Sequence, residues 1–95
     1  MGSAAANQAV NLPVQMMNLV DRSGRLTPMG FRYEDEEHQI HSIKVNRVIC
    51  REKLNLAGIR EIKIICGACF GETERLLELR YSVDSQQWRI YQFLN

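Results

Sequence analysis

The sequence predicts a small all-β fold, a six-stranded barrel or a strongly bent antiparallel sheet, from three observations. Stretches rich in β-branched and aromatic residues recur at roughly regular spacing, separated by turn-like segments. Within them apolar and polar residues alternate, as in a strand that buries one face. In one long stretch the alternation changes phase, which indicates a bend that lets a short sheet close on itself. The alternative class is α+β, if residues 12–20 or residues 72–80, which include the helix-tolerant stretch 73–79, form a helix.

The length and composition indicate one globular domain. The chain has 95 residues, of which 45% are hydrophobic and 24% are charged. Residues 1–9 are small and polar and read as a flexible lead or a vector-derived remnant, so we expect a single domain over residues 10–95. No apolar run approaches the ~20 residues that cross a bilayer, and no signal peptide opens the chain. We therefore expect a cytoplasmic protein with no membrane partner.

The first predicted hairpin joins residues 12–20 to residues 26–33 through the turn signal Asp21–Arg22–Ser23–Gly24. Aspartate opens turns by bonding its own backbone, and glycine supplies the positive φ that a bulged hairpin needs. Pro28 has no N–H to donate, so it marks an edge or a bulge of the returning strand. The expected inward residues of that strand are Met29, Phe31 and Tyr33.

The stretch from residue 38 to residue 51 predicts the sharpest bend. It is rich in β-branched residues, but its alternation slips between Val45 and Val48. A phase change inside one extended stretch requires a bulge or a bend. Residues 52–58 are then expected to form a loop, with one helical turn around Leu54–Leu56.

Three more strands are expected, at residues 59–68, 73–81 and 88–94. A turn bracketed by Gly67 and Gly71 separates the first two, and residues 84–87 turn the chain into the last. The expected inward residues of the first of these strands are Ile62, Ile64, Cys66 and Ala68.

Residues 14–93 resemble a group of short uncharacterised bacterial proteins. The resemblance lies in a Gly-x-Leu-x-Pro hairpin at residues 24–28, the basic-aromatic segment Phe31–Arg32–Tyr33 and the closing strand that begins Trp88–Arg89–Ile90. The chain departs from the group in a longer loop at residues 52–58 and in its paired cysteines. The group has no known activity, so the resemblance implies a fold and not a function.

The pair Cys66–Gly67–Ala68–Cys69 is a candidate metal site. Two cysteines at this spacing, at a strand end that enters a turn, can converge on a tetrahedral metal. Two more ligands are needed, and the candidates are Cys50, His38 and His41. A core role for Cys66 explains the pair without a metal, so no cofactor is expected. A redox dithiol would need a helix N-terminus in a βαβ setting, and the flanks read as strands.

The basic stretch 44–63 is a candidate nucleic-acid face. The formal net charge is only +1, with 12 basic against 11 acidic residues, so the chain as a whole carries no polyanion signature. Lysines and arginines beside stacking rings can still track a phosphate backbone. The candidate contacts are Lys44, Arg47, Arg51 and Lys53.

No constellation of nucleophile, base and stabilising group is evident, so we expect no enzyme activity. The remaining function class is a protein-interaction or structural module. Its partner would be another protein or a second copy, paired through exposed strand edges. Residues 12–20, which are apolar on both phases, and residues 91–94 are the segments expected to need covering.

Overall fold

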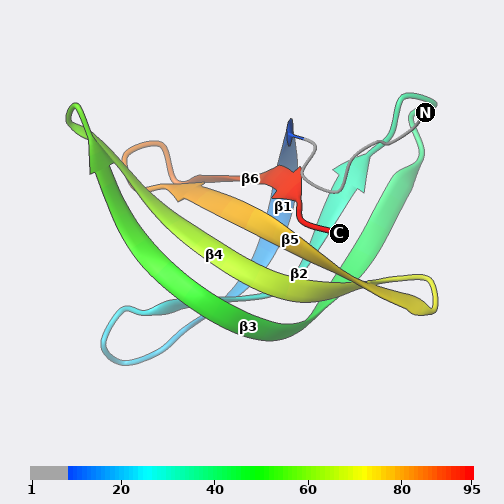
Figure 1. The fold of residues 1–95 in the computed structure, drawn as a ribbon, viewed down its shortest axis with the longest axis horizontal. Coiled ribbons are helices and arrows are strands. Elements are labelled where there is room, and N and C mark those ends of the chain that lie inside the picture. Colours follow the sequence, from blue (N-terminus) through cyan, green and yellow to red (C-terminus); the bar gives the residue numbers. More distant parts are fainter. Residues whose placement is uncertain (1–8) are drawn as a thin grey trace.

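The computed structural model describes residues 9–95. Of the expected lead at residues 1–9, only Ala9 lies within the described part of the chain. The described residues form six strands and no helix: β1 (Ala9–Val20), β2 (Leu26–Glu34), β3 (Ile40–Leu56), β4 (Ile59–Phe70), β5 (Thr73–Ser82) and β6 (Gln87–Phe93) (Figure 1). The all-β prediction is confirmed. The α+β alternative is wrong, because residues 12–20 and 73–79 are both strands.

The six strands form a closed antiparallel barrel in chain order. Each strand pairs with the next, and β6 returns to β1 with Leu12 opposite Ile90 and Val14 opposite Trp88. Closure removes the ordinary sheet edges and places one face of every strand inside. The core consists of Phe31, Ile43, Val45, Ile64, Cys66, Ala68, Leu77, Leu79, Trp88 and Ile90.

β3 is the strand that bends the sheet. Its first part, Ile40–Lys44, pairs with β2, and its long second part pairs only with β4. The register between β3 and β4 shifts at two places, between Val45 and Arg47 and between Val48 and Cys50. Each shift inserts an extra residue into β3 and so bends it and increases its twist. The predicted irregularity between Val45 and Val48 is confirmed.

The expected loop at residues 52–58 is wrong, as is the helical turn around Leu54–Leu56. β3 continues to Leu56 and β4 begins at Ile59, so only Ala57 and Gly58 form the turn. Both have positive φ, 52° and 82°, as a type I′ turn requires. The twist of that turn matches the twist of the strands, so the hairpin stays paired to its tip and projects beyond the barrel (Figure 1).

β2 contains a bulge that reverses the expected position of Met29. Asn18 of β1 pairs with Pro28 and Met17 pairs with Gly30, so Met29 is skipped in the ladder. Pro28 is fully buried and Met29 is 50% exposed. The expectation that Met29 points inward is therefore wrong, whereas the bulge that the proline predicts is confirmed.

The turn after β4 does not involve Gly67. This glycine lies inside the strand, and the two-residue turn is formed by Gly71 and Glu72. Above Gly67, Arg47 of β3 reaches across β4 to Glu74 of β5, with Nη2 and Oε1 2.9 Å apart. A Cβ at residue 67 would lie 2.6 Å from Oε2 of Glu74. The glycine therefore makes room for an ion pair and is not a turn residue.

The outer face of β4, β5 and β6 carries an ionic network of Glu61, Glu78, Arg80 and Arg89. Arg89 donates to both carboxylate oxygens of Glu61, at 3.1 and 3.3 Å. Arg80 bridges Glu61 at 3.1 Å and Glu78 at 2.5 Å. The Glu78 side chain is only 4% exposed. Hydrogen bonds between charged groups are stronger than those between neutral groups, so this network links β4, β5 and β6 outside the apolar core.

Candidate interaction surfaces

The two cysteines of the Cys-x-x-Cys pair lie on opposite faces of β4. The strand continues to Phe70, so the expected placement at a strand end is wrong. Cys66 is fully buried in the core, and Cys69 lies outside, where its thiol donates to Oδ1 of Asn46 at 3.1 Å. Burial raises the pKa of the Cys66 thiol to about 12, which keeps it protonated. The two sulfurs therefore do not converge.

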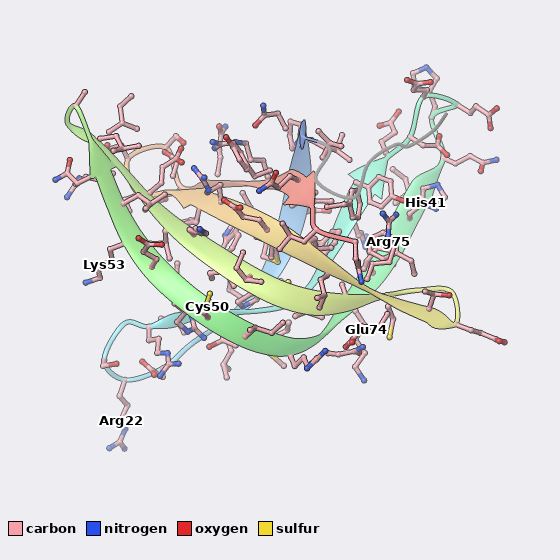
Figure 2. All side chains as sticks on the ribbon, in the orientation of Figure 1. Arg22, His41, Cys50, Lys53, Glu74 and Arg75 are labelled. Carbon is pink, nitrogen blue, oxygen red and sulfur yellow. The ribbon has the colours of Figure 1, made fainter. Side chains whose placement is uncertain are left out.

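The other candidate metal ligands are dispersed. Cys50 is exposed on β3, and Figure 2 shows it far from His41 along the same strand. Nδ1 of His38 lies 2.6 Å from Glu34, and Nε2 of His41 lies 2.8 Å from Asp35. The His41 bond, supported by backbone N–H groups of the turn, lowers the pKa of Asp35. Within residues 9–95 no group of three His, Cys, Asp or Glu side chains is placed to hold a metal ion.

Two of the four candidate nucleic-acid contacts, Lys44 and Arg47, lie on the outer face of β3. Lys44 is exposed and makes no ion pair within the described residues. Arg47 is held by Glu74, and that hydrogen bond raises the arginine pKa. Only Lys44 therefore offers a free cation on this part of the strand.

The other two, Arg51 and Lys53, lie on the inward face of β3, where Lys53 is opposite Ile62. Arg51 donates through Nη1 to the carbonyl of Leu26 and through Nη2 to Oγ1 of Thr27, the latter at 3.0 Å. These bonds close the corner where β2 and β3 stop pairing. The four cations are thus divided between two faces and do not form one stripe.

The aromatic rings that a nucleic-acid face would use for stacking are occupied. Phe31 and Trp88 are buried in the core. Each tyrosine ring lies against one neighbour. The ring centroids of Tyr33 and His41 are 4.9 Å apart, and those of Tyr81 and Trp88 are 5.0 Å apart. Cζ of Arg80 lies 4.0 Å from the ring centroid of Tyr91.

Apolar side chains gather on the outer face of the β1–β2 hairpin. Met17 is 69% exposed, Leu19 58% and Met29 50%. We call these three residues the methionine face. Sequence reasoning identified β1 as apolar on both phases, but it missed Met29, because the bulge that turns Met29 outward is a property of the pairing.

Beside the methionine face lies a shallow hollow of about 540 Å³. It forms over Gly30, which pairs with Met17 on one side and with Lys44 on the other and has no side chain to fill the space. A Cβ at this glycine would lie 3.0 Å from the carbonyl oxygen of Ile43. Arg32 and Lys44 line the hollow and are exposed. The face therefore combines flexible apolar groups with two cations.

A second hollow, of about 780 Å³, lies between the β1–β2 turn and the projecting β3–β4 hairpin. Its lining includes Arg25, Arg51 and Lys53 together with the apolar side chains Leu26 and Ile62. We call it the cationic hollow. The sequence did not identify Arg25 as a candidate residue, because it is distant in sequence from β3. Only the tertiary fold places it beside the same hollow as Arg51 and Lys53.

No known protein family, curated protein or solved structure matches the chain. No helix long and apolar enough to cross a membrane occurs in residues 9–95.

Proposed function

We propose that the protein is a protein-interaction module without catalytic activity, and that a partner protein docks on the methionine face. The observation that carries this proposal is the exposure of Met17, Leu19 and Met29 side by side, next to a hollow over Gly30. Exposed apolar groups that the core does not need are typical of docking sites. Methionine suits such sites because its side chain is flexible and polarisable.

The partner is a different protein that presents apolar side chains flanked by carboxylates. Arg32 and Lys44 border the hollow, and neither makes an ion pair within the described residues. A two-fold contact between two copies would bring these cations toward their own equivalents, since such interfaces bury the same patch twice. Like charges brought together at an interface are unfavourable. Charge complementarity therefore favours an acidic partner over a second copy.

Nucleic-acid binding is the weaker alternative. Arg47 is neutralised by Glu74, and Arg51 is tied to β2. The rings that would stack on bases are covered or buried. A surface of this kind lacks the combination of free cations and free rings that single-stranded nucleic acid requires.

Photo-crosslinking in cells tests the proposal. A benzophenone amino acid at Gln15, which lines the hollow, is expected to give one dominant adduct with another protein. The same label at Glu72, in the exposed β4–β5 turn, serves as the control and should give none. Met17→Asp should abolish the adduct at Gln15 without altering the fold, because residue 17 is exposed. An adduct that survives Met17→Asp, or one with the mass of a dimer, refutes the proposal.

A further inference from the structure

The cationic hollow opens onto an unpaired stretch of strand. β2 and β3 pair only where Gly30–Glu34 face Ile40–Lys44. Beyond Lys44, β3 keeps β4 on one side and has no strand from residues 9–95 on the other. The β1–β2 turn and the β3–β4 hairpin leave the barrel on the same side, and the hollow lies between them (Figure 1). The closed barrel thus retains a local free edge on β3, from residue 45 to residue 56.

Arg51 divides this free edge into two parts. Its guanidinium bonds to Leu26 and Thr27 and bridges the gap between β3 and β2. In the segment that follows, Glu52–Leu56, the outer backbone groups pair with no strand of residues 9–95, and residues 52–55 line the hollow. Such a row of N–H and C=O groups is a template for another strand.

Four basic residues line the hollow: Arg25, Arg51, Lys53 and Arg60. Arg25 and Lys53 make no ion pair within the described residues, and Figure 2 shows Lys53 pointing away from β3 into solvent. Arg60, at the rim, is neutralised by Asp84 at 2.6 Å.

Two acidic side chains, Glu52 and Glu61, also line the hollow, and each makes an ion pair with a basic side chain. Glu52 pairs with Lys63 on the outer face, and Glu61 belongs to the ionic network. Asp21 accepts bonds from the backbone N–H groups of its own turn, at Ser23 and Arg25. With four basic and two acidic residues in its lining, the hollow still carries a net positive charge.

Arg25 and Arg51 are close enough to repel each other. Burial lowers the pKa of the Arg51 guanidinium, and the positive charge of Arg25 lowers it further, while Asp21 acts in the opposite direction. An anion placed between the two guanidinium groups would relieve this repulsion. The lining of the hollow also contains the apolar side chains Leu26, Ile62 and Val83.

We propose that the cationic hollow binds an acidic, extended segment of another protein, which adds as a strand to Glu52–Leu56 of β3. Strand addition gives affinity through main-chain hydrogen bonds, and alternate side chains give specificity. Carboxylates on one face of the segment contact Arg25 and Lys53, and small apolar residues on the other face lie beside Leu54, which points to the opposite side of β3 from Lys53. This site is separate from the methionine face and does not depend on it.

A second copy of the chain does not fit this hollow. Two β3 edges paired with each other would place Arg51 and Lys53 close to their own equivalents, which is unfavourable. The chain's own acidic run, Glu34–Glu37, lies at the end of β2 and in the turn that follows, at the other end of the barrel (Figure 1). That turn is closed by Asp35 and is not an extended strand.

Fluorescence anisotropy with the labelled peptide GEVEIEVEG tests the proposal. The glutamine analogue GQVQIQVQG should bind at least about ten-fold more weakly, because two exposed ion pairs are lost. Arg25→Gln and Lys53→Gln should each weaken the glutamate peptide about five-fold. Lys63→Gln makes the same charge change on the outer face of β4 and should leave the affinity within about two-fold.

Amide hydrogen exchange in the same complex tests strand addition. Amides of Glu52–Leu56 that face the free edge should exchange more slowly when the peptide is bound. Equal binding of the two peptides, equal effects of Lys53→Gln and Lys63→Gln, or unchanged exchange at this edge overturns the proposal. So does tighter binding of a twelve-nucleotide oligothymidylate. Met17→Asp should not alter peptide affinity, so the result is independent of the methionine face.

Discussion

Replacing Arg80 by Met is expected to destabilise the barrel severely. The arginine side chain is 15% exposed, and its guanidinium bonds to Glu78 at 2.5 Å and to Glu61 at 3.1 Å. Without it, the buried Glu78 carboxylate keeps only the amide of Gln92, at 2.9 Å, whereas Glu61 keeps Arg89. An unpaired buried charge costs ~3–5 kcal/mol. Since only one of the two carboxylates is orphaned, we expect the free energy of unfolding to fall by about 3 kcal/mol.

Urea unfolding followed by the fluorescence of Trp88 measures this change. Trp88 is the chain's one tryptophan and is buried against Tyr81, so its emission reports on the core. With an m-value of about 1 to 2 kcal/mol per M, the midpoint should fall by about 1.5 to 3 M urea. Lys63→Met removes a cation from an exposed pair with an N–O distance of 3.8 Å, and should cost less than ~1 kcal/mol. Equal losses in the two variants would refute the reasoning.

The double variant Arg80→Met with Glu78→Leu separates the lost charge pairing from lost packing. Apolar residues of similar volume in place of a buried ion pair are often neutral or stabilising. We therefore expect the double variant to recover most of the stability that Arg80→Met loses. A double loss equal to the sum of the two single losses would show that the network's charges are not coupled.

Three further outcomes are expected. Ala57→Asn should stabilise the protein by about 0.5–1 kcal/mol in thermal unfolding, because asparagine tolerates the φ of 52° better than alanine; a loss would contradict the type I′ turn. Cys50 should react with a maleimide in the folded protein, while Cys66 should react only on unfolding, and equal rates would exclude the buried position of Cys66. Burial raises the pKa of Glu61, but hydrogen bonds from two arginines outweigh it and leave the pKa below 4.5. The stabilisation that ionised Glu61 gives the folded state is therefore complete above about pH 4.5 and is lost as the pH falls through the lowered pKa. Glu61→Gln should thus make the stability of the protein fall less steeply at acid pH. An unchanged dependence of stability on pH would contradict this.

The alternating pattern of the sequence was sufficient to predict the strands and the bend. The phase change between Val45 and Val48 marks the first irregularity of β3. Residues three apart in a regular strand point to opposite faces, so an extra residue is needed for both valines to face inward. Residues 73–79 have a fair helical composition, but Leu77 and Leu79 both face the core, and this spacing of two residues is that of a strand. Burial therefore overrides intrinsic propensity in this segment.

The errors arise where pairing, and not composition, decides the position of a residue. Ala57–Gly58 lacks the asparagine that usually marks a type I′ turn, so the hairpin tip reads as a loop. Met29 faces solvent because it is the extra residue of the bulge between Pro28 and Gly30, both of which are paired with β1. Gly67 reads as a turn residue, yet it is required beneath Arg47 and Glu74, a contact between distant strands.

The candidate sites were the least predictable part of the molecule. The basic stretch in β3 was visible in the sequence, but its division between two faces depends on the bulges that shift its register. Arg25 and Lys53 are distant in sequence. They line the same hollow because it lies between the β1–β2 turn, which carries Arg25, and the β3–β4 hairpin, which carries Lys53. A sequence pattern indicates the charge of each strand but not which cations remain unpaired.

Oxidative footprinting of the methionines in cell extract tests the central claim most directly. Met17 and Met29 are exposed in the isolated protein, whereas the neighbouring Met16 is partly buried and itself lines the hollow, so it is not used as the reference. Ile40, exposed at the far end of the barrel, corrects for the radical dose. If a partner docks on the methionine face, Met17 and Met29 are oxidised more slowly in extract than in the purified protein, and Met17→Asp removes the protection at Met29. Equal oxidation of Met17 and Met29 in both settings would contradict the claim.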